Sequence, residues 1–306
     1  MVSAARERGE EAIVVTFWPH PRTVLQQDAR DLRLLSTQEE KKELLHEAGI
    51  DRVEVLPFTR SFASLKAADY LTLLRDRFHA SLIVMGYDNR IGSDNLTASE
   101  ICAPQAVASR PLPECVVLRM TQWAPPGEPG DIACPPYNPP RGISALTGQA
   151  EGGHVPADHT SPAPVSSTQI RKALEEGKID EANGMLGYRY GLYGVVVAGN
   201  RMGRTIGFPT ANMQLYEPLK LVPANGAYVV EVEVLGKKFT GMCNIGLRPT
   251  VDGKARTIET HILDFDEDIY GLPMGIRFVR RLRDERKFPS LDALREQLEI
   301  DKSSIK

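Results

Sequence analysis

Glycine, arginine and oxygen-bearing side chains crowd one stretch in the C-terminal half of the chain. Its sequence is Gly199-Asn200-Arg201-Met202-Gly203-Arg204-Thr205-Ile206-Gly207-Phe208-Pro209-Thr210-Ala211-Asn212. Glycine lets backbone N–H groups approach an anion closely, and the guanidinium group of arginine pairs with phosphate oxygens. The stretch could therefore hold the phosphate chain of a nucleotide. It is not a Walker loop, because no Gly-Lys-Ser/Thr follows, and a tight turn between strands explains the glycine spacing as readily.

Thr210 and Asn212 end this stretch two residues apart. In an extended segment, residues at this spacing point to the same face, so a hydroxyl and an amide oxygen would lie side by side. Magnesium takes hard oxygen ligands and keeps water and phosphate oxygens in its coordination shell. The pair is therefore a candidate anchor for Mg²⁺ and ATP.

Glu259 is a candidate general base. It lies in a run of alternating character, TIETHIL from Thr257, which predicts a strand with Glu259 and His261 on the face opposite Ile258 and Ile262. A carboxylate at such a position could accept the proton of a hydroxyl nucleophile during phosphoryl transfer. Taken alone, a glutamate on a strand is more often simply solvated. His261 is interpreted as a structural histidine.

A second group of phosphate-binding residue types follows residue 165. The run is Ser166-Ser167-Thr168-Gln169-Ile170-Arg171, directly before a helical pattern. Hydroxyls at a helix N-terminus, with an arginine about one turn later, could hold phosphates. An ordinary helix cap explains the serines and threonine without any ligand.

The elements that must position these residues fall into two kinds. Up to about residue 120, strands expected at 12–17, 52–58 and 81–87 alternate with helices at 36–48 and 68–79, the former with Ser36 and Glu39 spaced as a capping box. This order predicts a parallel sheet with helices on its faces, whose ligands lie beyond the carboxyl ends of the strands. Pro19-His20-Pro21 and Gly86-Tyr87-Asp88 fall at that edge.

Short strands separated by glycine turns predict a small closed barrel in the C-terminal part. Helices are expected at 169–176 and 179–186, followed by strands at 192–198, 227–235, 238–245, 257–263 and 275–279. Gly236-Lys237 is a hairpin signal, and Ser290 is the expected cap of a last helix at 290–300. Between the two parts, residues 123–164 are rich in proline and glycine and predict a disordered or extended linker, with a proline-rich ligand for a partner as the alternative.

The overall composition excludes several classes of protein. The chain has 306 residues, 42% of them hydrophobic, and a formal net charge of −3, so no general attraction to nucleic acid or to an anionic membrane is expected. No apolar run approaches the ~20 residues of a membrane span. The four cysteines form no CxxC pair and have no metal-ligand spacing, which predicts reduced thiols and a cytoplasmic protein.

Several C-terminal motifs together resemble one known family. They are the run from Gly199 to Asn212, Asn244-Ile245-Gly246, Arg248-Pro249-Thr250, TIETHILDFDEDIYG from Thr257, Arg281-Leu282-Arg283 and Lys287-Phe288. Over about residues 186–302 the chain is similar to the kinase module of bacterial bifunctional riboflavin kinase/FMN adenylyltransferase (FAD synthetase). The resemblance implies a six-stranded β-barrel that transfers the γ-phosphate of ATP to the terminal ribityl hydroxyl of riboflavin, giving FMN.

The resemblance also assigns roles to single residues. Thr210 and Asn212 would hold Mg²⁺ and the nucleotide phosphates, and Glu259 would be the general base. Such a site suits phosphoryl transfer, which depends mainly on positioning and charge stabilisation. The phosphate loop would include Gly199, Gly203 and Arg204.

The N-terminal half resembles the adenylyltransferase module of the same family, a Rossmann-like α/β fold. The similar segments are Thr16-Phe17-Trp18-Pro19-His20-Pro21, Leu56-Pro57-Phe58-Thr59, Gly86-Tyr87-Asp88-Asn89-Arg90-Ile91-Gly92 and the run from Ser166 to Arg171. The resemblance implies that Ser166, Ser167, Thr168 and Arg171 form the second nucleotide-binding motif of that module.

Three departures from the family pattern concern adenylyl transfer. The family's histidine–any–glycine–histidine signature does not occur in the sequence, and we expect the chain to start downstream of it. Asn89 and Ile91 stand where the family has aromatic residues, which weakens a flavin-stacking surface. The proline-rich stretch replaces the region before Ser166. We therefore expect the chain to make FAD poorly or not at all, because phosphate-gripping groups supply most of the transition-state stabilisation.

The resulting expectation is an α/β plus β protein in four parts. They are an incomplete Rossmann-like nucleotidyltransferase α/β domain at 1–122, an insert or linker at 123–164, the helical end of the first domain at 165–185, and a β-barrel riboflavin kinase domain with a C-terminal helix at 186–306. Riboflavin, FMN and ATP are the expected small-molecule partners, with Mg²⁺ as cofactor, and no protein partner is assigned.

Three other readings of the sequence remain. A fully bifunctional enzyme would have its signature encoded upstream, beyond an error in the gene model. A flavin or nucleotide sensor would keep the barrel without turnover, but Glu259, Thr210 and Asn212 together argue against it, since binding alone needs no positioned base. A barrel that binds RNA is disfavoured by the acidic balance and by the lack of an interleaved basic and aromatic surface.

Overall fold

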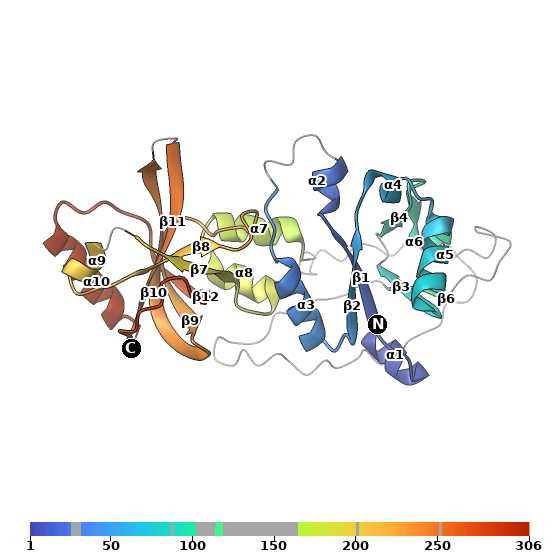
Figure 1. Cartoon of the computed structure of the whole chain (residues 1–306), viewed down its shortest axis with the longest axis horizontal. Helices are drawn as coiled ribbons and strands as arrows, with labels where there is room; N and C mark the ends of the chain where they lie inside the picture. The colour runs from blue at the N-terminus through green and yellow to red at the C-terminus, as the bar shows by residue number, and fades with distance from the viewer. Residues whose placement is uncertain are drawn as a thin grey trace, which may run out of the picture. The chain divides into compact units, whose positions relative to one another are not determined.

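The computed structural model describes residues 1–25, 32–86, 89–101, 114–118, 165–199, 202–250 and 253–305. The chain divides into two units, shown in Figure 1. Among the described residues, the first unit holds those up to Leu118 except Arg33–Thr37, and the second holds Arg33–Thr37 and everything from Val165 onward. The proline-rich stretch 123–164 and Tyr87-Asp88 lie outside the described residues.

Parallel strands and helices alternate in the first unit, as the sequence predicts. Strands β1 (Ile13–Trp18) and β2 (Arg52–Pro57) form one parallel pair, and β3 (Leu82–Gly86) and β6 (Glu114–Leu118) form another. A short hairpin joins β4 (Arg90–Ile91) to β5 (Leu96–Thr97). The helices are α1 (Val2–Arg8), α2 (Pro21–Leu25), α3 (Gln38–Glu47), α4 (Arg60–Ala63), α5 (Ala67–Phe78) and α6 (Ala98–Ile101).

Two details of this unit differ from the sequence expectation. Helix α3 begins at Gln38, two residues after Ser36, so Ser36 does not stand where the cap of that helix would be. The expected single sheet consists, in the described ranges, of two separate two-stranded parallel sheets. At the carboxyl end of β1, four aromatic rings pack together with centroid separations of 5.4 to 6.3 Å. They belong to Phe17, Phe58, Phe62 and Tyr70.

A closed six-stranded barrel forms the centre of the second unit, which confirms the predicted fold. Its strands are β7 (Gly191–Val197), β8 (Ala211–Leu215), β9 (Gly226–Val234), β10 (Lys237–Thr250), β11 (Gly253–Ile262) and β12 (Pro273–Arg283). They close in the order β10-β11-β8-β7-β12-β9, and every neighbouring pair is antiparallel. The helices are α7 (Ser167–Glu175), α8 (Ile179–Leu186), α9 (Met202–Thr205) and α10 (Leu291–Ser303).

Helices α7 and α8 share the barrel's core. Ile170, Leu174 and Ile179 are buried in the same cluster as the inward-facing strand residues. The buried Asn183 fixes the arrangement, because its amide donates to the carbonyl oxygen of Phe278 at 3.0 Å and accepts from the backbone of Tyr190 at 2.8 Å. The assignment of residues 165–185 to the first domain stays a prediction.

A five-residue segment from the first half of the chain belongs to the barrel unit. Leu34 pairs with the segment before β9 through Leu34 N to Leu219 O (2.8 Å) and Leu221 N to Leu34 O (2.9 Å). The ammonium group of Lys220, which is 4% exposed, donates to the carbonyl oxygen of Leu35 at 2.9 Å and lies 4.6 Å from the ring centroid of Tyr190. The sequence pattern does not predict this pairing.

Among the described residues, none of the helices combines the length and the apolar character that crossing a membrane requires.

Candidate active site

Glu259 lies in a row of residues that crosses the barrel strands. In the antiparallel ladders it stands opposite Asn212 of β8 on one side and Asn244 of β10 on the other. Directly opposed residues in such ladders point to the same face with their Cβ atoms about 4.5–5.5 Å apart. The register therefore brings together one carboxylate and two amides from three strands.

This row is on the face of the strands turned away from the core. Ile258, Thr260 and Ile262 of β11 are buried in the barrel, whereas Glu259 and the residues two positions away are only half-buried. Asn212 and Asn244 show the same contrast with their neighbours along β8 and β10. A ligand on this face can therefore reach the three side chains without entering the packed core.

The loop between β7 and β8 closes on the same row. A Cβ atom at Gly199 would lie 2.1 Å from the amide nitrogen of Asn212, so a side chain here would force that amide to move. Farther along, a Cβ atom at Gly203 would lie 2.1 Å from the carbonyl oxygen of Phe208, and the backbone N–H of Phe208 donates to Gly203 at 2.8 Å. The two glycines that the sequence singled out therefore allow close backbone approaches, one of them to a candidate magnesium ligand.

Thr210 directly precedes β8. Because it lies two residues before Asn212 in extended chain, its side chain points to the same outward face as that of Asn212. It is half-buried, and its methyl group would be 3.5 Å from a Cβ at Gly203. Arg204 lies in α9 with an exposed side chain. Gly199 and Glu259 are thus both neighbours of Asn212, and Thr210 lies two residues before Asn212 in the chain.

His261 supports the segment that carries Thr210. Its Nδ1 lies 2.8 Å from the carbonyl oxygen of Pro209, and its ring packs edge-on against Phe208 at 5.0 Å between centroids. A carbonyl oxygen only accepts hydrogen bonds, so Nδ1 carries the proton. Burial lowers the pKa of His261 below its ordinary value of 6.5. The ring is therefore a neutral donor that fixes the backbone immediately before Thr210.

The oxygen donors of the row fit magnesium. Mg²⁺ binds through one or two protein oxygens plus phosphate and water oxygens rather than through a protein cage. The hydroxyl of Thr210, the amide oxygen of Asn212 and the carboxylate of Glu259 supply such oxygens on one face. Within the described ranges, no group of three His, Cys, Asp or Glu residues forms a metal cage.

Asn244 is a candidate site residue that the sequence reasoning missed. It opposes Glu259 in β10, and the next residue but one, Gly246, faces Glu285: a Cβ at Gly246 would be 2.5 Å from that carboxylate. The signal was present in the Asn244-Ile245-Gly246 motif, which contributed to the resemblance without receiving a role. Only the pairing of β10 with β11 shows that its amide stands beside Glu259.

The second predicted phosphate-binding run forms a helix cap. Ser166 caps α7: its Oγ accepts from the backbone of Gln169 at 3.3 Å, and the side chain of Gln169 accepts from the backbone of Ser166 at 2.9 Å. Ser167 and Thr168 are exposed in the first turn. Arg171 donates to the carbonyl oxygen of Arg33 at 3.0 Å. These contacts account for Ser166 and Arg171 structurally, and the role of all four residues in binding phosphate stays a prediction.

Comparisons with known proteins agree with this geometry. A family model described as riboflavin kinase matches residues 186–306, and one described as FAD synthetase matches residues 1–108. A Listeria monocytogenes protein named bifunctional riboflavin kinase/FMN adenylyltransferase is 31% identical over 303 residues, which cover 99% of this chain and 83% of that protein. A Bacillus subtilis protein of the same name is 31% identical over 301 residues, covering 97% and 82% respectively.

Among solved structures, a Streptococcus pneumoniae chain described as a macrolide-efflux protein has a TM-score of 0.78 and 30% identity. The match covers 98% of this chain and 85% of that one. The efflux description is a statement about the Streptococcus protein, whereas the shared fold extends over both units of the present chain. With its barrel, its two matching family models and its curated relatives, this chain belongs to the bifunctional riboflavin kinase/FMN adenylyltransferase family.

Proposed function

We propose that the barrel unit phosphorylates riboflavin to FMN with Mg·ATP. The row formed by Asn212, Glu259 and Asn244 is the observation that carries this proposal. It sets a carboxylate next to the end of a glycine-containing loop, as a reaction between a nucleotide phosphate and a hydroxyl group requires. The relatives' printed names and the matching kinase family model support the choice of riboflavin as the hydroxyl substrate.

The residues in and around the row have separate tasks in this reaction. The terminal ribityl oxygen of riboflavin attacks the γ-phosphorus of ATP, the bond from that phosphorus to the ADP oxygen breaks, and the hydroxyl proton passes to Glu259. Thr210 and Asn212 hold Mg²⁺, which when bound neutralises charge on the phosphate oxygens. Gly199, Gly203 and Arg204 contact the phosphate chain, and His261 keeps the Pro209–Thr210 backbone in place.

The direct test is FMN formation by the whole chain from riboflavin and ATP, with and without Mg²⁺. We expect phosphate from the γ-position of ATP to appear in FMN only when Mg²⁺ is present. Replacing Asn212 with Ala should raise the Mg²⁺ concentration needed for half-maximal rate. A folded chain that binds riboflavin without forming FMN would favour the sensor reading instead.

We propose in addition that FMN adenylyl transfer, which the relatives' names include, is weak in this chain. The sequence contains no histidine–any–glycine–histidine signature, and transition-state stabilisation by phosphate-gripping groups is usually the largest catalytic contribution. With FMN and radiolabelled ATP, we expect FAD to form at least roughly a hundredfold more slowly than FMN forms from riboflavin. FAD formation at a similar rate would overturn this second proposal and leave the first intact.

We also place these reactions in the cytoplasm. The buried thiol of Cys243, unpaired among the described cysteines, supports this assignment, as does the use of ATP.

A further inference from the structure

Two strands of the first unit each have an unpaired edge. In the described part of the unit, β1 pairs only with β2, and β3 pairs only with β6. An unpaired strand edge carries a row of backbone N–H and C=O groups that are available to another strand. Two such edges facing each other would accept a single strand between them.

The amino ends of β1 and β3 lie side by side. The hydroxyl of Ser81, directly before β3, donates to the carboxylate of Glu10, shortly before β1, at 2.6 Å. At the opposite end, the ring of Phe17 in β1 lies 6.3 Å from Tyr70 in α5. The backbone N–H of Ala67, the first residue of α5, donates to the carboxylate of Asp94 at 2.9 Å, and Asp94 lies in the β4–β5 hairpin that follows β3 in the chain. Both strands therefore run in the same direction.

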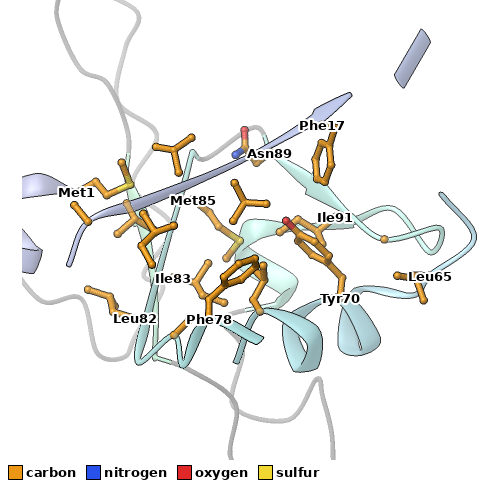
Figure 2. Close-up of a pocket in the computed structure, with 18 of the residues that line it drawn as sticks. Met1, Phe17, Leu65, Tyr70, Phe78, Leu82, Ile83, Met85, Asn89 and Ile91 are labelled. Carbon is orange, nitrogen blue, oxygen red and sulfur yellow. The ribbon is translucent and has the colours of Figure 1, made fainter. Parts of the chain in front are cut away.

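A cavity of about 830 Å³ separates the two edges. It is lined by residues 12–15 along β1 and 82–85 along β3. Consecutive residues of a strand point to alternate faces, so a cavity that touches four in a row borders the edge of each strand rather than one face. In Figure 2, Met1 lies toward one end of this space, and Phe17 and Ile91 lie toward the other.

The size and lining of this slot, defined as the cavity between β1 and β3, fit one β-strand. A five-residue strand is about 17 Å long, about 4.8 Å wide and about 10 Å thick in a packed sheet, or about 800 Å³. The walls are mainly aliphatic and aromatic, and burial raises the pKa of Tyr70 in one wall to about 12. A strand that packs against such walls needs apolar side chains where it contacts them.

We propose that the slot binds one extended, apolar peptide segment of about five residues, parallel to β1 and β3 and hydrogen-bonded to both. A flavin or nucleotide ring could occupy the same volume, but it would leave the two rows of backbone groups unpaired. Burying unpaired backbone groups is costly. This binding site does not depend on the kinase reaction of the barrel.

The test uses the whole chain and a synthetic peptide, acetyl-Lys-Val-Val-Ile-Ala-Val-Lys-amide, with carbon-13 in its central carbonyl groups. We expect saturable binding, a rise in the unfolding temperature of the chain, and a labelled amide I band at β-sheet frequency. A matched peptide with N-methyl groups at alternate central positions keeps every side chain but loses backbone donors. We expect it to bind at least tenfold more weakly.

Two variants locate the binding site. Val84→Lys puts a charge into the slot wall, and we expect at least a tenfold loss of peptide affinity. Val55→Lys changes a half-buried residue of β2 that does not line the slot, and should leave affinity unchanged. Equal binding of the N-methylated peptide, displacement of the peptide by FMN or ATP, or absence of binding would each overturn the proposal. Self-association of the chain through the slot would also overturn the proposal if added peptide did not reduce it.

Discussion

The amide of Asn212 lies close to the backbone of Gly199. Gly199 lies against it on one side and Glu259 is its partner across the ladder on the other. At the residue scale, glycine at position 199 matters to the site as much as the polar residues do, because any side chain there would occupy the space of the amide.

Gly199→Ala should therefore lower kcat/KM for FMN formation, by roughly a hundredfold if the amide moves by about 1 Å. Gly184→Ala is the matched control, because its added methyl group meets nothing within 4 Å in α8. We expect the control to keep full activity and to gain up to about 1 kcal/mol of stability. Steady-state kinetics and urea unfolding of both variants check this, and an active Gly199→Ala enzyme would contradict the close approach.

His261 supports a prediction about pH. Its folded-state pKa is lowered by burial, so the unfolded chain binds more protons than the folded chain just below pH 6.5. The stability that neutral His261 contributes is present above that pH and is lost as pH falls toward the folded-state pKa. His261→Phe keeps the ring and removes the titration. We expect its free energy of unfolding to fall less than that of the parent between about pH 7.5 and about pH 5.

Urea denaturation at both pH values measures the free energy of unfolding. An equal decrease in parent and variant would contradict the lowered pKa of His261. The same variant loses the hydrogen bond to Pro209. We therefore also expect a higher KM for Mg·ATP at neutral pH.

At the scale of elements, the hairpin between β9 and β10 places a leucine in an unfavourable backbone conformation. Its two turn residues, Leu235 and Gly236, have φ values of 53° and 70°. A left-handed conformation suits glycine and asparagine but costs about 1–2 kcal/mol for most other residues. Leu235→Asn should raise the free energy of unfolding by about 1 kcal/mol. Leu247→Asn, at an equally exposed strand position, should give no gain in thermal denaturation.

Most elements could be predicted from the sequence because their patterns are local. Burial alternates along β11 from Thr257 to Ile262 and over the last five residues of β9, and this alternation is visible in the residues themselves. Ser290 caps α10 as expected, accepting from Ala293 at 3.2 Å. Strand β8 was not predicted as a strand in its own right. It has only five residues, and Gly207 and Pro209 just before it favour a turn. Its place in the barrel depends on pairing with β7 and β11, which are distant in sequence.

The candidate site was predictable in composition but not in arrangement. Motifs identified Thr210, Asn212 and Glu259, since their chemistry suits a phosphoryl transfer. That Glu259 stands opposite Asn212 and Asn244 follows from the registers of two ladders, and a single sequence does not specify register between distant strands. The sequence favours a structural role for His261, but its partner, the carbonyl oxygen of Pro209, could not be named because the contact depends on how distant strands pair.

At the scale of the whole molecule, the two units are not continuous in sequence. Residues 33–37 join the barrel unit although the segments before and after them belong to the first unit. The buried ammonium group of Lys220 links this segment to the core, between the carbonyl of Leu35 and the ring of Tyr190. The barrel unit is therefore completed by a piece of chain that lies far from it in sequence.

Lys220→Met should lower the free energy of unfolding of the barrel unit by about 1–3 kcal/mol, because it leaves the Leu35 carbonyl without its donor while keeping most of the side-chain volume. Lys238→Met, an exposed lysine in β10, is the control and should change stability little. Urea unfolding followed by fluorescence checks both variants. An unchanged transition in Lys220→Met would show that the segment does not stabilise the barrel.

The central claim is that Glu259 is the base of a riboflavin kinase. The most direct measurement is the single-turnover rate of FMN formation by the parent chain, by Glu259→Gln and by Thr257→Val, which alters the same face of β11 two residues away. We predict a loss of roughly a hundredfold or more in Glu259→Gln, with riboflavin affinity retained, and a nearly unchanged rate in Thr257→Val. A Glu259→Gln rate within a few-fold of the parent would contradict the account.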